Sequence, residues 1–463
     1  MGGLIAAPRH RANPQNESVP APISLAVNQR ISISQLRSPK GTSKPQGCFV
    51  HCSGRKAYWG SLELHQYPDA SAVVRALSPD EPVILNRPHA AARAARFFVE
   101  QFPGKSLYAV KANPSPELLR VLWDAGVTHY DVASIAEVRL VRATLPAATL
   151  CFMHPVKPRA AIAEAYKVHG VRVFSLDTQE ELDKIVAATD AATDLYLCVR
   201  LRVSSDYSEL SLASKFGVDL ADAAPLLQAT RQVADALGIC FHVGSQAMTP
   251  FAYVQALERV RAAIVDAAVT VDIIDVGGGF PSIYPGMEPP PLEDYFASIH
   301  RASESLPISY SSELWCEPGR ALCAEYNSMI VRVEKRRGDE LFINDGAYGA
   351  LYDAAHVGWR FPVRVLRDEP ANDLGGAMQS FSFYGPTCDD ADFMEGPFML
   401  PADIAAGDFI EVGMLGAYGA AMKTAFNGFG QAALTEVQDE PMASQYLGNR
   451  RDPRHSDNVV SLR

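Results

Sequence analysis

Between residues 107 and 316, short runs of β-branched and aromatic residues alternate with Ala- and Leu-rich stretches of helical periodicity. Eight such strand–helix units in about 210 residues favour a (β/α)8 barrel, and a doubly wound parallel sheet is the structural alternative. The predicted strands cover 107–110, 128–132, 150–153, 171–176, 195–203, 239–243, 271–276 and 314–316. The predicted helices cover 116–125, 135–144, 159–169, 180–188, 221–237, 251–268 and 292–305.

The regions before and after these units have a different texture. Residues 1–45 are rich in Pro, Ser, Asn, Gln and Arg, which predicts a disordered extension, and 446–463 predict a flexible tail. We expect the barrel over 86–310 and a mainly β domain over 311–445, which the N-terminal segment 46–85 joins with a strand. The β domain's predicted elements are strands at 329–334, 340–344, 361–365, 380–384 and 409–412 and a helix at 417–425.

Composition excludes several classes of protein. The 463 residues carry a net charge of −11, which argues against a nucleic-acid or anionic-membrane partner. There is no apolar run long enough to span a membrane and no signal-peptide pattern. The eight cysteines are scattered, as in a cytoplasmic protein with reduced thiols. Cys48, His51 and Cys52 lack a second ligand pair at zinc-site spacing, so we expect no metal.

In a (β/α)8 barrel the active site lies where the strands end at their carboxyl side. Ionisable residues or glycines stand at or just after the ends of all eight predicted strands, so they should converge on one rim. They are Lys111, Asp131, His154, Asp177, Arg200, Arg202, His242, the glycines 277–279 and Glu317.

Part of this rim is suited to a phosphate. The glycines 277–279 can turn backbone N–H groups toward an anion, and Ser245 and Arg320 add a hydroxyl and a fixed cation. A buried Lys111 beside such a site could form a Schiff base with an aldehyde, and pyridoxal phosphate carries both groups. Glu317 could pair with its ring nitrogen. The alternative for Lys111 is a strand-end lysine that reaches solvent.

The motifs occur in the order found in one enzyme family. They are Y-A-V-K-A-N-P, Y-D-V-A-S-x-A-E, S-K-F-G, F-H-V-G-S-Q, D-V-G-G-G-F-P, E-P-G-R, N-D-G-A-Y-G, G-P-T-C-D and G-A-Y-G-A-A-x-K-T-A-F-N-G-F. Through these motifs the chain resembles the fold-type III pyridoxal-phosphate decarboxylases, which act on ornithine, arginine or diaminopimelate. The resemblance extends from about residue 80 to 435. The family's fold is a barrel followed by a β domain that includes an N-terminal strand.

The resemblance implies roles for individual residues. Lys111 would carry the cofactor, Glu317 would pair with the pyridine nitrogen and His242 would stack on the ring. The enzyme would be a homodimer with shared active sites, in which Cys388 from the other subunit helps to protonate the product. The phosphate would be held by Ser245, Gly278, Gly279, Arg320 and Tyr418. The polar network around the cofactor would include Asp131, Glu137 and Arg200.

The same resemblance implies a substrate. G-P-T-C-D-D and L-Y-D-A-A-H are similar to the ornithine enzymes, with Tyr352, Asp353, Cys388 and Asp389 around the substrate. Two carboxylates suit a distal ammonium, so we expect L-ornithine to give putrescine in polyamine biosynthesis, with lysine to cadaverine as a further activity. Diaminopimelate, D-ornithine or D-lysine are alternative substrates. An alanine racemase, which would have Arg rather than Glu317, and a non-catalytic homologue are rivals. His154 departs from the family's usual Asn.

Overall fold

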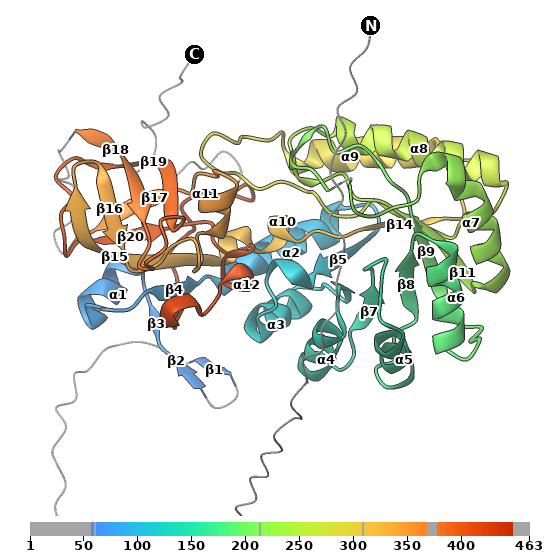
Figure 1. Ribbon diagram of the computed structural model, residues 1–463, viewed down its shortest axis with the longest axis horizontal. Helices are drawn as coiled ribbons and strands as arrows, with labels where there is room; N and C mark the ends of the chain where they lie inside the picture. Colours follow the sequence, from blue (N-terminus) through green and yellow to red (C-terminus); the bar gives the residue numbers. More distant parts are fainter. Residues whose placement is uncertain (1–56, 60–61, 213, 308–309, 368–376, 448–463) are drawn as a thin grey trace, which may run out of the picture. The chain divides into compact units, whose positions relative to one another are not determined.

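The computed structural model describes residues 57–59, 62–212, 214–307, 310–367 and 377–447 (Figure 1). The predictions for residues 1–45, for the Cys48–Cys52 pattern and for the tail beyond 447 lie outside the described residues. Within them, no helix combines the length and apolarity needed to cross a bilayer.

Eight parallel strands form a closed barrel, so the (β/α)8 prediction is confirmed and the doubly wound sheet is wrong. The last strand closes on the first, with Trp315 opposite Lys105. This last strand lies beyond residue 310, where we expected the barrel to end. The strands are β5 (Lys105–Ala109), β6 (His129–Val132), β7 (Thr149–Phe152), β8 (Val173–Leu176), β9 (Tyr196–Arg200), β11 (Ala236–Cys240), β13 (Ile273–Asp275) and β14 (Glu313–Cys316).

Alternation along these strands separates two apolar clusters. Leu107 belongs to a small cluster of barrel residues that includes Cys151, Cys198 and Cys240. The next residue, Tyr108, belongs to the large cluster shared with the surrounding helices. The six cysteines in the described residues are free thiols, as expected.

Helices connect the strands around the outside of the barrel (Figure 1). The helix predicted for 221–237 is too long, because it ends at Val233 and residues 236–240 are the sixth barrel strand. An Ala- and Leu-rich run suits both structures, so composition could not place the boundary. The helices are α2 (Pro88–Gln101), α3 (Pro116–Asp124), α4 (Ile135–Thr144), α5 (Arg159–Lys167), α6 (Gln179–Ala188), α7 (Leu220–Val233), α8 (Phe251–Ala267) and α9 (Leu292–Glu304).

The second domain is a nine-stranded sheet, ordered β19-β18-β16-β15-β4-β21-β3, with β20 between β15 and β17. Strand β4 precedes the barrel in sequence but pairs with β15 and β21, which confirms that an N-terminal strand joins this domain. The sheet strands are β3 (Gln66–Tyr67), β4 (Val83–Asn86), β15 (Asn327–Arg337), β16 (Glu340–Ile343), β17 (Val363–Leu366), β18 (Met378–Tyr384), β19 (Phe393–Pro401), β20 (Phe409–Val412) and β21 (Ala433–Val437). Helix α1 (Ala70–Leu77) lies between β3 and β4, and the helix expected over 417–425 is only α12 (Gly419–Met422).

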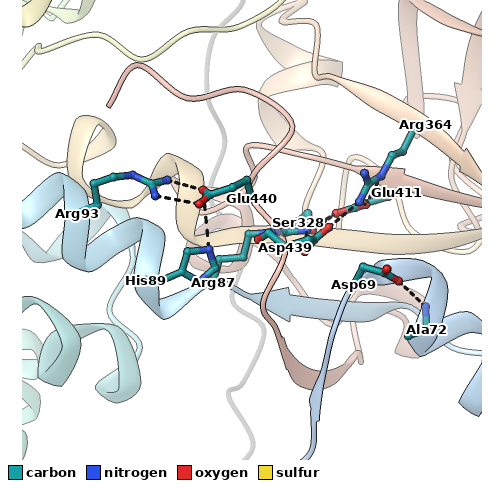
Figure 2. A network of polar contacts seen from close by, with 10 residues as sticks. All are labelled: Asp69, Ala72, Arg87, His89, Arg93, Ser328, Arg364, Glu411, Asp439 and Glu440. Carbon is teal, nitrogen blue, oxygen red and sulfur yellow. Dashed lines mark hydrogen bonds and ion pairs between the residues drawn. The ribbon is translucent and has the colours of Figure 1, made fainter. Parts of the chain in front are cut away.

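A buried ionic network ties this sheet together (Figure 2). Arg87, which follows β4, donates to Glu411 of β20 at 2.9 Å and to Asp439 at 2.8 Å. Ser328 of β15 also donates to Glu411, at 2.6 Å, and Arg364 of β17 binds both acids. The network thus joins the start of α2 to three strands and to the segment after β21.

Candidate active site

Lys111 lies in a single 3-10 turn, Val110–Ala112, directly after β5 rather than inside the strand. Its Nζ donates to Asp131 Oδ2 at 2.9 Å, and Asp131 is buried at the end of β6. The lysine side chain itself is 40% exposed. Burial lowers the pKa of Lys111, but the carboxylates of Asp131 and Glu317 outweigh it and raise the pKa overall. Lys111 is therefore held as an ammonium at the barrel mouth, where Asp131 fixes its Nζ while part of the side chain remains exposed.

The sheet domain holds the Lys111 turn from behind. Tyr418 N–H donates to Ala112 O at 2.8 Å. The Asn113 side chain donates to Gly416 O at 2.8 Å and to Asn327 Oδ1 at 3.0 Å. The position of Lys111 thus depends on residues from both domains.

Two buried carboxylates meet below the mouth. Asp275, at the end of β13, accepts from Gly277 N–H at 2.9 Å, while its other oxygen has no hydrogen-bond partner. Burial raises the pKa of Asp275 to about 6. Burial, then the charges of Asp275 and Asp131, raises the pKa of Glu317 well above its usual range. A cation beside Glu317 would relieve this repulsion. Asp275 was missed by our role assignments, although it opens the D-V-G-G-G motif.

His242 packs closely against the glycines that follow β13. His242 Nδ1 accepts from Gly244 N–H at 3.0 Å, so the neutral ring carries its proton on Nε2. Burial, with Lys111 and Arg200 nearby, lowers the pKa of His242 well below its usual value. A Cβ on Gly278 would lie 2.8 Å from Glu317 O and 2.9 Å from His242 Nε2. Only a glycine at 278 leaves the space beside the imidazole open.

Arg320 is a buried cation with hydrogen-bonding capacity to spare. Its guanidinium donates to Tyr284 Oη at 3.1 Å and to Asp353 Oδ2 at 3.3 Å, while its Nε has no partner. It stacks over the Tyr418 ring at 4.8 Å and the Trp359 ring at 4.2 Å. This group can hold an anion such as a phosphate. Sequence reasoning missed Tyr284 and Trp359, and it did not foresee that Arg320 contacts Asp353.

Other predicted rim residues are less central. Ser245 is half-buried at the start of β12 (Ser245–Ala247), and Arg200 ends β9 with its guanidinium 5.6 Å from the Phe216 ring. Glu137 accepts from Ala133 N–H next to Asp131. Asp177 instead accepts from Gly217 N–H at 2.8 Å.

His154 and Arg202 complete the set. The His154 ring packs edge-on against Phe216 at 5.1 Å, and its Nδ1 accepts from Val156 N–H. Arg202 lies beyond β9 and pairs with the exposed Asp219.

Cys388 and Asp389 lie on a loop of the sheet domain. Cys388 is exposed, with its Sγ 3.4 Å from Asn427 Oδ1. Asp389 accepts from Tyr348 Oη, and this hydrogen bond lowers the pKa of Asp389. Neither residue contacts Lys111 or Glu317 within the described chain. Tyr352 and Asp353 begin α11 (Tyr352–His356), where Asp353 is buried against Arg320.

A lysine, a buried acid pair, glycines packed against a histidine and a guanidinium with an unpartnered Nε at the mouth of a (β/α)8 barrel define an enzyme site for a phosphate-bearing aldehyde cofactor. The sequence matches the family "Pyridoxal-dependent decarboxylase, pyridoxal binding domain" over residues 89–324. It also matches "Pyridoxal-dependent decarboxylase, C-terminal sheet domain" over residues 322–416. The chain belongs to the pyridoxal-dependent decarboxylases, and its cofactor is pyridoxal phosphate.

Similar proteins include decarboxylases of basic amino acids and an antizyme inhibitor. The chain is 31% identical over 343 residues to the lysine/ornithine decarboxylase of Selenomonas ruminantium, which covers 72% of this chain and 84% of that protein. It is 31% identical over 374 residues to the ornithine decarboxylase of Cricetulus griseus, covering 74% and 78%. Antizyme inhibitor 2 of Xenopus laevis is 28% identical over 362 residues, covering 71% and 74%.

Among solved structures, the arginine decarboxylase of Paramecium bursaria Chlorella virus bound to agmatine superposes with a TM-score of 0.70 at 26% identity. The match covers 79% of this chain and 98% of that one.

Proposed function

We propose that this enzyme decarboxylates L-ornithine to putrescine, in polyamine biosynthesis, and converts lysine to cadaverine as a second activity. The observation that carries the proposal is the Lys111–Asp131 ion pair beside Glu317, because it places an amine, its charge partner and a buried acid together at the barrel mouth. The lysine/ornithine and ornithine decarboxylases among its relatives support the substrate class.

The residues at the barrel mouth fit pyridoxal phosphate. The unpartnered Arg320 Nε is a donor for the phosphate, and Arg320 stacks on the Tyr418 ring. Gly278, Gly279 and Ser245 would complete the phosphate site. Burial and like charge leave Glu317 in need of a cation, which a protonated ring nitrogen would provide. Lys111 would bind the aldehyde carbon. The neutral His242 would face the ring without adding charge.

The protein's own groups then have defined tasks. Bound pyridoxal phosphate supplies an electron sink for the bond that breaks as carbon dioxide leaves. Glu317 would keep the ring nitrogen protonated, while Asp131 would hold the proton of Lys111 Nζ until the amine is needed. After carbon dioxide has left, Cys388 Sγ from a second copy of the chain would deliver the proton to the product carbon.

Substrate choice would depend on two carboxylates. Asp353 lies beside Arg320, and burial raises its pKa although Arg320 opposes this. Asp389 is held as an anion by Tyr348 on the loop that carries Cys388. We propose that Asp353 of one subunit and Asp389 of the other bind the distal ammonium of ornithine in a homodimer. The exposure of Cys388 within one chain is compatible with this sharing.

A product assay on the cofactor-loaded protein tests the substrate. L- and D-ornithine, L- and D-lysine, arginine and meso-diaminopimelate are offered separately, and each amine is identified by mass. We expect putrescine from L-ornithine to form fastest. Turnover of only a D-substrate or of diaminopimelate would refute the substrate, and a chain that binds no cofactor would support a non-catalytic homologue.

Paired variants test the residue roles. Lys111→Ala should abolish turnover, whereas Lys105→Ala should retain it, because Lys105 begins the strand that Lys111 follows and pairs with the exposed Glu313. Asp389→Asn should raise KM for ornithine, and the exposed neighbour change Asp390→Asn should not. Equal effects within either pair would contradict the assignments.

Subunit mixing tests the shared site. Inactive Lys111→Ala and Cys388→Ala chains should regain activity when they exchange subunits, because one site in each hybrid dimer has both residues. No recovery after confirmed exchange would refute the shared site.

A further inference from the structure

A cavity of about 440 Å³ lies between the sheet domain and two barrel helices. None of the candidate active-site residues lines it. Its volume falls in the range of small-molecule sites. The lining residues used below are His89 of α2, Glu117 and Val121 of α3, Tyr326, and Glu436 and Val437 of β21.

Glu436 is the unusual member of this lining. Its side chain is 6% exposed, yet its carboxylate makes no hydrogen bond or ion pair with any residue in the described part of the chain. Burial raises the pKa of Glu436, and no nearby cation opposes that shift. The preceding residue, Thr435, is satisfied by a 2.6 Å hydrogen bond to His65 O. The Glu436 oxygens are not enclosed by the protein, so they face the cavity and can accept from a donor that enters it.

A second carboxylate faces the same space. Glu117, in the first turn of α3, also makes no ion pair with another described residue. Burial raises the pKa of the Tyr326 hydroxyl, and the charges of Glu117 and Glu436 raise it further. Both acids therefore act on one phenol group in the lining of the cavity.

His89 adds an uncharged acceptor. Its Nε2 has no hydrogen-bond partner and lies 3.9 Å from a Glu440 oxygen (Figure 2). Burial lowers the pKa of His89, with Arg93 and Arg87 contributing and Glu440 opposing. A neutral imidazole does not repel a cation, so it leaves the attraction of the two carboxylates intact.

We propose that this cavity binds a primary aliphatic amine. Its ammonium would lie between Glu117 and Glu436 and near the Tyr326 ring, and its carbon chain would contact Val121 and Val437. Calcium and magnesium need six or more oxygen ligands and zinc needs three or four protein ligands, and in the described residues no cluster of three metal-ligating side chains occurs. The proposal does not depend on ornithine as the substrate, because the amine need not react.

Calorimetric titration of the cofactor-loaded full chain with butylamine tests the proposal. Butylamine that reaches the barrel mouth would change the absorbance spectrum of the cofactor. Heat released without a change in that spectrum would therefore report binding in the cavity. Glu436→Gln should weaken that site at least tenfold, since the amide keeps the shape and removes the charge. Butanol, which lacks the ammonium, should not bind there.

Two further variants keep the test decisive. Glu440→Gln is the matched control: it lies beside His89 but does not line the cavity, so binding should be unchanged. Val121→Phe should block the site by filling it, without changing either carboxylate, and serves if Glu436→Gln does not fold. Undiminished butylamine binding in both cavity variants, equal binding of butanol, or displacement by potassium or magnesium ions alone would overturn the proposal.

Discussion

Glu411 is the centre of the ionic network that joins the sheet strands (Figure 2). It is fully buried and accepts from Arg87, Ser328 and Arg364. The change Glu411→Gln keeps the size of the side chain and removes its charge. Arg87 would then remain buried with Asp439 as its only acid. We expect a large loss of stability, because a buried cation would have lost one of its two counterions.

The magnitude follows from the pKa of Glu411. Burial alone would raise it, but Arg87, Arg364 and Ser328 lower it from 4.5 to about 2. A pKa unit corresponds to about 1.4 kcal/mol, so the interaction contributes about 3 kcal/mol. Breaking one side of a buried ion pair typically costs about 3–5 kcal/mol, which agrees. Because the folded-state pKa is lowered, this stability is present above pH 4.5 and is lost as the pH falls toward 2.

Urea unfolding followed by tryptophan fluorescence measures the effect. At about pH 7 the free energy of unfolding of Glu411→Gln should be lower than that of the unmodified protein by about 3 kcal/mol. The difference should shrink by about 1.4 kcal/mol between about pH 5.5 and about pH 3.5. Asp80→Asn, which removes an exposed ion pair with Arg332, is the control and should shift little. A difference that is small, or that does not change with pH, would refute this reasoning.

Three further changes probe the site. Asp275→Asn should stabilise the cofactor-free protein by at most about 3 kcal/mol when the pH is above about 6, the pKa of Asp275, because a raised carboxyl pKa lowers stability at such pH values. Thermal unfolding of both proteins at one pH below and one pH above this pKa measures the difference. Gly278→Ala should weaken cofactor binding at least tenfold by the clash with Glu317 O and His242, which an absorbance titration would detect. Asp392→Ala should loosen the loop carrying Cys388, because Asp392 accepts from Thr387 N–H and Ala347 N–H; faster hydrogen exchange at 385–390 is the readout.

The barrel was predictable because its strands are continuous apolar runs separated by amphipathic helices. Parallel strands are buried on both faces, which is why their sequences are apolar throughout. Two of the sheet strands that were not predicted, β19 and β21, show where such patterns fail. Strand β19 contains Gly396-Pro397, which reads locally as a turn, and only its pairing with β18 makes it a strand. Strand β21 is a five-residue segment that is exposed at its start and buried at its end, and its place between β4 and β3 is set by distant residues.

The site was predictable to the extent that it follows strand ends. Lys111, Asp131 and Glu317 converge because parallel strands end on one rim. The contact between Arg320 and Asp353 could not be foreseen, because it joins residues from two domains and no local pattern encodes a distance between them. The burial of Glu436 could not be predicted either, because a glutamate in a short strand is expected to be exposed unless its spatial neighbours are known.

The hydrogen bonds by which the sheet domain holds the Lys111 turn have a consequence for the order of events during synthesis. Asn113 and Gly416, which hold one another across the domains, are 303 residues apart in the chain. A ribosome adds about 5–20 residues per second, so roughly 15–60 seconds separate the synthesis of the two. During that interval the nascent barrel carries its lysine on an unsupported turn. Cofactor binding would therefore be one of the last steps in the synthesis and folding of each molecule. A chain truncated before residue 416 would leave the ribosome with an incomplete active site.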